Sequence, residues 1–269
     1  MEAATTGDNH APGFAKHPGH KVEFEVSPKR IRATFDGRTI VDSTRALVVR
    51  ESRHVPVYYF PRDDVAMDAL APTDHSTYCP FKGHASYLTV ASGDRLAENA
   101  VWSYEDPYVE VAGLKDYVAF YWDRMDAWFE EDEEVFVHAR DPHVRVDILD
   151  SSRPVRVVLD GETVAETSRA RFLFETGLPT RYYIPKDDVK TGLLVPSETV
   201  TACPYKGNAH YYSVQVGDRL HEDIVWFYDD PVHEAAKIKT YLCFFNERVD
   251  DIFVDDEAVP KTKTKWSPK

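Results

Sequence analysis

The chain has 269 residues, and its 46 Asp and Glu against 32 Lys and Arg give a net charge of −14. Such a charge repels phosphate backbones and anionic headgroups, so we expect neither a nucleic-acid partner nor a membrane partner. No apolar run approaches the roughly 20 residues that cross a bilayer, no secretory signal is visible, and three separated Cys form no disulfide framework, which together predict a cytoplasmic protein.

Alternating apolar and polar residues predict short β-strands in the first half of the chain. The pattern is clearest at 22–26 and 31–35, and Asp36-Gly37 then predicts a hairpin turn. A short helix is expected over 63–70, directly after Pro61. Further strands are predicted at 46–49, 57–60, 85–90 and 117–121.

The same patterns return in the second half of the chain at an offset of 124 residues. Cys-Pro-Phe-Lys-Gly at 79–83 recurs as Cys-Pro-Tyr-Lys-Gly at 203–207, and the offset holds without a gap from Asp36 to Asp126. Over that stretch 39 of 91 positions are identical. The period is too long for a solenoid, so the sequence indicates a gene duplication in which each copy has its own core.

This organisation predicts four segments: a disordered N-terminus at 1–16, a first repeat domain at 17–139, a second repeat domain at 140–260 and a loose basic tail at 261–269. Short strands without long amphipathic helices predict a mainly β protein made of two homologous small antiparallel β domains with short helices. The junction between the copies is short, so we expect them to pack against each other, and a homo-oligomer is left open.

Each copy carries an ordered set of motifs. In the first copy these are Ser43-Thr44-Arg45-Ala46, Tyr58-Tyr59-Phe60-Pro61, Asp63-Asp64-Val65, Cys79-Pro80-Phe81-Lys82-Gly83 and Trp102-Ser103-Tyr104. The set resembles the family known as domain of unknown function 427, and the resemblance covers nearly all of both copies. It implies a tent-like β fold, similar in outline to that of methionine sulfoxide reductases, and it implies no activity. An older family label mentions nucleotidyl transfer, but the chain has no Gly-rich phosphate loop.

Lys82, Gly83 and His84 place a cation, a flexible backbone and an imidazole within three residues. Lys82 is a candidate charge stabiliser and His84 a candidate general acid or base, while Gly83 suits a positive φ. The predicted catalytic set is completed by one carboxylate and two phenols: Glu51, Tyr58 and Tyr104.

Residues around this set are candidates for substrate binding, because Tyr and Trp line wet pockets as well as cores. They are Trp102, Tyr87, His75, Arg45 and Cys79. Arg45 and Glu51 are six positions apart, so in a regular strand they would share a face and could pair. The corresponding candidates in the second copy are Lys206, His210, Tyr182, Tyr228, Trp226 and Glu175.

No metal site is expected. Each Cys-Pro motif has one Cys, and Lys82 and Lys206 stand where a second Cys ligand of zinc would be. Cys243 lies in an apolar stretch and is expected in the core. Cys79 lies beside Lys82, and a nearby cation favours thiolate, so a thiol-dependent redox role for Cys79 stays open.

These residues favour a cofactor-independent enzyme of the lyase type, acting by retro-aldol or elimination chemistry on an aromatic or phenolic small molecule. The first copy is favoured as the active one, because it follows the family pattern at Lys82 and His84. Two alternatives remain at this point: a non-catalytic small-molecule-binding or scaffold protein, and the thiol-dependent enzyme that uses Cys79.

Overall fold

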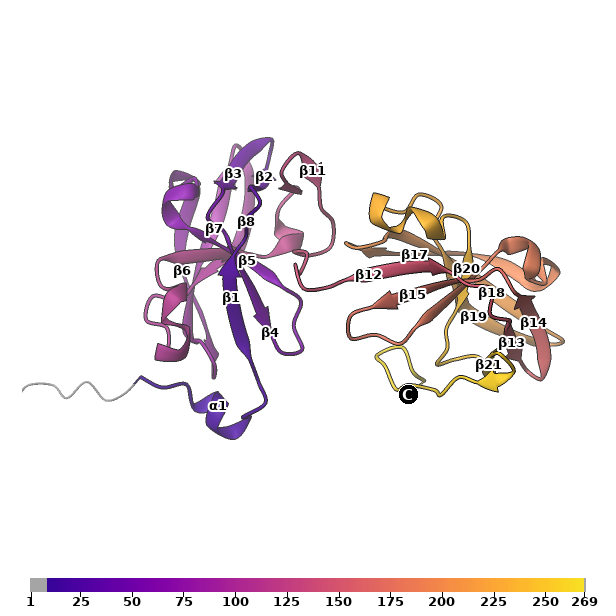
Figure 1. The fold of residues 1–269 in the computed structure, drawn as a ribbon. Coiled ribbons are helices and arrows are strands. Elements are labelled where there is room, and N and C mark those ends of the chain that lie inside the picture. Colours follow the sequence, from indigo (N-terminus) through magenta and orange to yellow (C-terminus); the bar gives the residue numbers. More distant parts are fainter. Residues whose placement is uncertain (1–8, 269) are drawn as a thin grey trace, which may run out of the picture. The chain divides into compact units, whose positions relative to one another are not determined.

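The computed structural model describes residues 9–268, which divide into two compact units between Asp141 and Pro142. Each unit has one seven-stranded sheet and one four-stranded sheet, and all strand pairs in them are antiparallel (Figure 1). The expectation of two small antiparallel β domains with short helices is therefore confirmed. No helix among the described residues is long and apolar enough to cross a membrane.

The first domain has its large sheet in the order β1-β4-β5-β9-β8-β7-β6 and its small sheet in the order β11-β10-β2-β3. The strands of the large sheet are, in that order, β1 (Val22–Val26), β4 (Leu47–Glu51), β5 (Val57–Pro61), β9 (Tyr117–Phe120), β8 (Arg95–Ser103), β7 (Gly83–Ser92) and β6 (Leu70–Cys79). Those of the small sheet are β11 (Glu133–Glu134), β10 (Ala127–Glu130), β2 (Ile31–Phe35) and β3 (Arg38–Ser43).

The second domain repeats this topology, strand for strand. Its large sheet contains β12 (Val146–Asp150), β15 (Arg171–Glu175), β16 (Arg181–Ile184), β20 (Leu242–Phe244), β19 (Arg219–Phe227), β18 (Gly207–Val216) and β17 (Leu194–Cys203). Its small sheet contains β14 (Glu162–Thr167), β13 (Val155–Leu159), β21 (Asp251–Val254) and β22 (Glu257–Ala258).

The helical segments are short, as expected. The one α-helix of the described chain is α1 (Pro12–Lys16). The others are 3₁₀ turns: Arg62–Asp64, Met67–Ala69, Val109–Leu114, Trp122–Arg124, Lys186–Asp188, Thr191–Leu193 and His233–Ile238.

Strand alternation decides which side chains enter the core. In β2 the apolar Ile31, Ala33 and Phe35 are buried, and the polar residues between them are partly exposed. Asp36 and Gly37 follow with φ of 53° and 72°, which is the left-handed pair that a tight hairpin turn into β3 requires.

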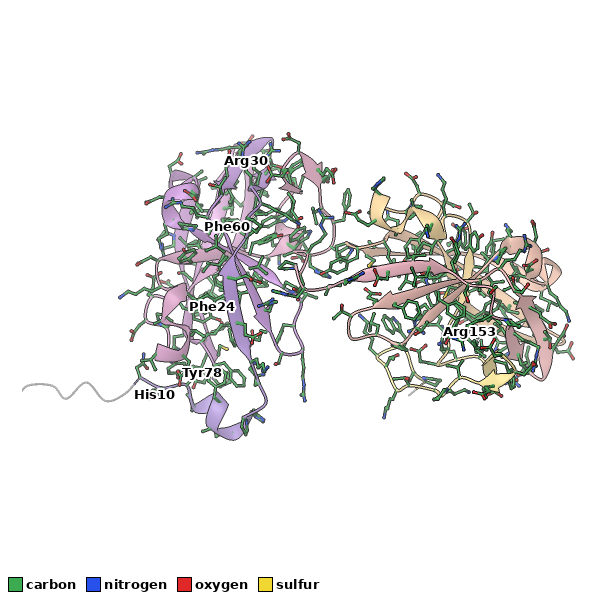
Figure 2. The ribbon with its side chains drawn as sticks, viewed as in Figure 1. His10, Phe24, Arg30, Phe60, Tyr78 and Arg153 are labelled. Carbon is green, nitrogen blue, oxygen red and sulfur yellow. The ribbon has the colours of Figure 1, made fainter. Side chains whose placement is uncertain are left out.

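Each large sheet is covered on both faces. In the first domain one face packs against the small sheet, around the fully buried Phe60 on β5 (Figure 2). The opposite face carries a second apolar cluster that includes Leu47, Tyr59 and the 3₁₀ turn Val109–Leu114. Neighbouring residues of β5 therefore face two different environments.

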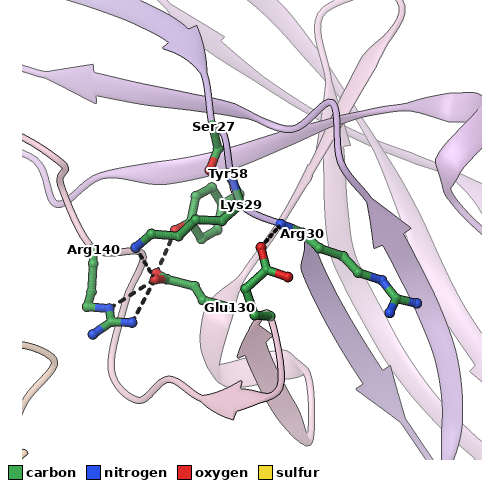
Figure 3. Close-up of polar contacts among 7 residues, drawn as sticks. Ser27, Lys29, Arg30, Tyr58, Glu130 and Arg140 are labelled. Atoms are coloured by element: carbon green, nitrogen blue, oxygen red, sulfur yellow. Dashed lines mark hydrogen bonds and ion pairs between the residues drawn. The ribbon is translucent and has the colours of Figure 1, made fainter.

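A buried carboxylate ties the small sheet to the large one in the first domain. Glu130 on β10 accepts hydrogen bonds from the Tyr58 hydroxyl at 2.7 Å, from Lys29 at 2.5 Å and from Arg140 at 2.8 and 3.0 Å (Figure 3). Burial raises the pKa of Glu130, but these hydrogen bonds outweigh that effect and hold the pKa below its ordinary value.

The segment before β1 is ordered from residue 9, unlike the disorder expected for 1–16; residues 1–8 lie outside the described chain. Helix α1 docks on the first domain because the Gly13 amide donates to the Pro80 carbonyl at 2.9 Å. The Phe14 ring meets Phe81 edge-on with ring centroids 5.1 Å apart. Ahead of the helix, His10 lies 3.0 Å from Glu110. Backbone and aromatic contacts thus hold a segment whose composition suggested a loose end.

The tail beyond residue 260 also packs on its domain, where a loose segment was expected. The Thr264 hydroxyl donates to Glu247 at 2.6 Å, and the Trp266 ring lies 6.5 Å from that of Phe245. The basic residues of the tail obscured this single aromatic anchor; residue 269 lies outside the description.

The helix expected over 63–70 is replaced by two 3₁₀ turns. Val65, between them, forms a bridge to Val41 of β3, and Leu70 already begins β6. The bridge to the edge strand of the small sheet therefore holds Val65 in an extended conformation, which interrupts the expected α-helix.

Candidate functional site

The first domain has a pocket of about 250 Å³ on the face of its large sheet that lies away from the small sheet. Strands β4, β5, β7 and β8 supply most of its wall. It is lined by Val49, Glu51, His54, Val55, Val57, Tyr59, Lys82, Tyr87, Trp102, Tyr104 and Tyr121.

The polar end of the pocket is a carboxylate held by two nitrogen groups. Glu51 ends β4, and Lys82 lies in the turn between β6 and β7, where its ammonium donates to Glu51 Oε2. His20 Nε2 lies 3.0 Å from the other oxygen, Oε1. The His20 ring also stacks on Phe81, with ring centroids 3.6 Å apart and an interplanar angle of 9°.

Gly83 makes this turn possible. Its φ is 106°, in the region that favours glycine, and an added Cβ would lie 3.3 Å from the Asp106 carbonyl oxygen. The next residue, His84, then begins the run of β7 in which alternate side chains point to opposite faces. The positive φ expected for Gly83 from the sequence is confirmed.

The electrostatics of Glu51 are a balance of burial and pairing. Burial raises the pKa of the carboxyl, but the hydrogen bonds from Lys82 and His20 outweigh it, so the pKa lies below its ordinary value. Glu51 is therefore ionised at neutral pH, and it faces an ammonium group whose charge it compensates.

The rest of the wall is aromatic and hydrogen-bonded. Trp102 Nε1 donates to the Tyr59 hydroxyl at 3.0 Å, and the two rings meet edge-on. Tyr121 packs against Trp102 with ring centroids 4.7 Å apart. The Tyr87 hydroxyl lies 2.9 Å from that of Thr77.

Three phenols of the pocket, those of Tyr59, Tyr104 and Tyr121, have raised pKa values and are protonated at neutral pH. Burial raises the pKa of Tyr59 and of Tyr104 well above the ordinary value of 10.0, and burial with the neighbouring Tyr87 raises the pKa of Tyr121 to about 12. Within residues 9–268 the Tyr104 hydroxyl has no hydrogen-bond partner. It is thus a donor available to a molecule in the pocket.

The second domain keeps the frame of this site. Lys206 donates to Glu175 at 2.5 Å, and Trp226 Nε1 donates to the Tyr183 hydroxyl at 3.0 Å. Tyr228 stands at the position of Tyr104, and burial raises its pKa well above the ordinary value.

The space in front of this frame is filled in the second domain. The Arg181 guanidinium makes two hydrogen bonds of 2.7 Å to Glu247, and both side chains are buried. The guanidinium lies over the Trp226 ring at 5.5 Å and over the Trp266 ring at 5.3 Å. Each domain therefore has an equivalent aromatic wall, but in the second domain the Arg181 side chain covers it, and in the first domain the pocket lies there.

A family comparison matches both halves of the chain. The family model described as domain of unknown function (DUF427) matches residues 23–131 and 147–255. The chain belongs to the DUF427 family. The tandem duplication seen in the sequence is confirmed by the two matched regions. A comparison with curated proteins finds no match.

In the first DUF427 domain the structure brings together five of the ten residues proposed from the sequence. They are Glu51, Lys82, Tyr87, Trp102 and Tyr104, all of which line the pocket. Cys79 does not line the pocket; it ends β6 and packs, half-buried, against the apolar cluster to which Tyr59, Tyr87 and Tyr104 belong.

Two proposed catalytic residues of this DUF427 domain lie away from the pocket. Tyr58 is on the opposite face of β5 and donates to Glu130 in the core. His84 is exposed on the opposite face of β7, with its ring 4.9 Å from that of Tyr78. Strand alternation explains both cases: Tyr58 is one position from the pocket-lining Tyr59 in β5, and His84 is three positions from the pocket-lining Tyr87 in β7.

Arg45 and His75 also lie elsewhere. Arg45 precedes β4 and forms an ion pair with Asp64, so the predicted pairing of Arg45 with Glu51 is wrong. The reason is that the regular strand begins only at Leu47, and alternation does not extend back to Arg45. His75 is exposed on β6, with its ring 4.5 Å from that of Tyr87.

The candidates of the second DUF427 domain divide in the same way. Lys206, Glu175, Trp226 and Tyr228 lie on the face that corresponds to the pocket. Tyr182 faces the core between the sheets, as Tyr58 does. His210 lies on the other face of β18, with its ring 5.8 Å from that of Phe227. Neither His84 nor His210 therefore lies on the pocket-facing side of its strand.

Sequence reasoning missed three polar or aromatic residues of the first DUF427 site: Tyr59, His54 and His20. Tyr59 is the neighbour of the predicted Tyr58, and only the strand register shows that Tyr59 faces the pocket. His54 lies in the loop after β4. His20 comes from the segment before β1, and no local pattern links it to Glu51. Within the described chain no three His, Cys, Asp or Glu side chains are grouped so as to hold a metal ion.

Proposed function

We propose that the first domain binds a small aromatic or phenolic molecule in its pocket and transforms it by acid–base chemistry of the lyase type. The observation that carries the proposal is the Glu51–Lys82 pair at the polar end of an aromatic-lined pocket. A volume of about 250 Å³ is just below the roughly 300–1,000 Å³ of pockets for drug-sized ligands, which suits a molecule of one ring.

The pocket offers the groups that a retro-aldol cleavage needs. Glu51, as carboxylate, accepts the proton of a substrate β-hydroxyl, whose O–H electrons form the new carbonyl while the adjacent C–C bond breaks. The electron pair moves into an enolate, and its oxygen is stabilised by the Lys82 ammonium. A proton passed back from the Glu51 carboxyl completes the second product, so atoms and electrons balance without a co-reactant.

Tyr104 fits the part of a hydrogen-bond donor to the substrate. Its hydroxyl lacks a partner within the described chain, and its raised pKa keeps it protonated. The aromatic rings of Tyr59, Trp102 and Tyr121 supply flat surfaces for a ring. This scheme assigns no step to a metal, an organic cofactor or the thiol of Cys79.

The test is a thermal-shift screen of the full chain against small phenolic and aromatic metabolites, with mass spectrometry of each mixture that raises the melting temperature. Glu51→Gln and Lys82→Met should each lower turnover of the converted compound at least 100-fold, in line with the usual contribution of a general base. The matched variants Glu175→Gln and Lys206→Met, at the filled site of the second domain, should leave turnover within 2-fold of wild type.

Three results would contradict the proposal. A ligand that stabilises the protein and returns unchanged from every mixture would indicate a binding protein. Full turnover in Glu51→Gln would exclude the carboxylate as base. Loss of turnover in Cys79→Ser together with full turnover in Lys82→Met would instead favour thiol chemistry.

A further inference from the structure

The second domain holds a planar cation in front of its aromatic wall. The Arg181 guanidinium lies over two indole rings, 5.5 Å from the centroid of Trp226 and 5.3 Å from that of Trp266, and its side chain is 6% exposed. Both of its oxygen partners belong to Glu247, whose side chain is 1% exposed. A cation over aromatic faces and beside a carboxylate is a favourable arrangement, because ring quadrupole and carboxylate both attract it.

Arg181 stands where the first domain has a pocket-lining valine. Arg181 pairs with Leu173 in the ladder of β15 and β16, as Val57 pairs with Val49 in the ladder of β4 and β5. Val57 lines the pocket. The long side chain therefore fills, in the second domain, the space that stays open in front of Val57 in the first.

The surroundings of that space correspond as well. At equivalent positions of the two copies, the first domain has Trp102 where the second has Trp226, and Tyr121 where the second has Phe245. Asp123 occupies the position of Glu247. It does not line the pocket, but its charge contributes to the raised pKa of Tyr121, which does. The side chain of Asp123 is exposed, and within residues 9–268 it has no ion-pair partner. The first domain thus keeps an aromatic wall and an acidic residue, and it lacks the internal cation that satisfies them in the second.

We propose that the first-domain pocket takes a ligand with a planar organic cation, of the guanidinium or amidinium class, which stacks on Trp102 with its charge toward Asp123. The inference rests on the proposed function, since it narrows the substrate class of the same pocket. In this proposal the Arg181 guanidinium of the second domain occupies the space that corresponds to the one the ligand's cationic group takes in the first domain.

The ammonium of Lys82 does not oppose such a ligand. Its charge is compensated by Glu51, and the second domain contains the equivalent Lys206–Glu175 pair together with the Arg181 guanidinium. The net charge of −14 adds a long-range attraction for cations.

Three molecules of nearly equal shape distinguish the contribution of ligand charge to the affinity from that of the aromatic ring: benzamidine, benzamide and benzoate. Titration calorimetry of the full chain at pH 7.5 and low salt should give one benzamidine site, with binding at least 10-fold tighter than that of benzamide, and no detectable binding of benzoate. Equal affinity for benzamidine and benzamide, or tighter binding of benzoate, would overturn the assignment of a cationic ligand.

Two variants tie the signal to this pocket. Asp123→Asn changes an exposed side chain and should weaken benzamidine binding about 3- to 10-fold, with little change for benzamide. Val57→Arg with Asp123→Glu copies the second domain and should abolish benzamidine binding with retained folding, as seen in circular dichroism. Undiminished benzamidine binding in both variants would place the site elsewhere and overturn the inference.

The same titrations distinguish the inference from the proposed function. If phenol binds and benzamidine does not, the cation class is wrong and the aromatic pocket stands. If a bound amidine is detected and no compound of the phenolic screen or amidine series is ever converted, the cation class stands and the lyase assignment falls.

Discussion

Glu130 and its counterpart Val254 show how one position can separate two copies of the same frame. In the first domain the buried Glu130 is held by Tyr58, Lys29 and Arg140 (Figure 3). In the second domain Val254 simply packs into the core. A buried carboxylate is stable only when its oxygens are satisfied, so the first domain depends on three donors that the second does not need.

Replacing Glu130 should reveal this dependence through pH. Because its pKa is lowered in the folded state, its contribution to stability is present above the ordinary value of 4.5 and is lost as the pH falls through the lowered value. Glu130→Gln should therefore destabilise the first domain by about 3 kcal/mol at pH 7, and this difference from wild type should shrink progressively below pH 4.5 in denaturant titrations.

The control for this prediction is Glu133→Gln, which removes an exposed carboxylate from the neighbouring β11. It should change the free energy of unfolding by no more than about 0.5 kcal/mol at any pH. A difference between Glu130→Gln and wild type that stayed constant from pH 7 to pH 3 would show that the carboxylate of Glu130 is not selectively stabilised by folding.

At the residue scale the sequence predicts which residue types the site contains better than it predicts which face of the sheet each side chain points to. The repeated Tyr-Tyr pair predicts that one phenol belongs to the site. Only the register, which places Tyr59 opposite Leu47, shows that this residue lies on the same face of the sheet as Glu51. The sequence predicts both Glu51 and Lys82 as site residues, because each lies in or beside a repeated motif. It does not predict His20, because this residue precedes the repeated motifs and no local pattern links it to Glu51.

Two short segments outside the family-matched regions distinguish the two domains at the level of elements. The segment before β1 brings His20 to Glu51 in the first domain. The segment after β22 brings Thr264 and Trp266 to the Arg181–Glu247 pair in the second. The shared frame comes from the duplication, and these appended segments give each site its own surroundings.

The N-terminal segment should be sensitive to the size of residue 13. A Cβ on Gly13 would lie 2.6 Å from the Phe81 ring and 2.7 Å from the Pro80 carbonyl oxygen, so one of them must shift. Gly13→Ala should therefore lower hydrogen-exchange protection of residues 9–20 at least 10-fold, by a penalty of about 1–3 kcal/mol for overpacking.

Gly19→Ala is the matched control, because nothing lies within 4 Å of a Cβ built there. It should leave the exchange of residues 9–20 within 2-fold of wild type. Equal protection in wild type and Gly13→Ala would mean that α1 does not dock through the contact between Gly13 and Pro80.

Strand prediction succeeded where apolar and polar residues alternate along the sequence. The ranges of β1 and β2 were predicted to the residue, and in β2 the apolar residues are the buried ones. The strand β6 was missed, since most of this edge strand is exposed and it contains Pro72. The nine-residue β8 was missed as well, because charged residues near its start interrupt the pattern.

At the scale of the whole molecule the chain is two units with separate cores. Substitutions in different units that share no partners should have additive effects on stability. Trp266 contacts Arg181 and Phe245 of the second unit, so we expect its removal to lower the stability of that unit.

Trp266→Ala should destabilise the second unit by about 1–2 kcal/mol, because a half-buried ring and a cation–π contact to Arg181 are lost. Hydrogen exchange should speed up around Glu247 and β16 and stay unchanged in residues 9–141. Lys261→Ala, which truncates an exposed side chain of the same tail, should alter neither unit. Unchanged exchange around Glu247 and β16 would contradict this prediction.

The placement of the two appended segments sets an order of events during synthesis. The ribosome makes the segment with His20 before any strand of the first domain, so it is already present when β4 and Glu51 emerge. Trp266 is made after every strand of the second domain. Of the two rings over Arg181, Trp226 is therefore made as part of the sheet, whereas Trp266 follows it, so the cover of the Arg181–Glu247 pair is completed only when the segment after β22 has been made.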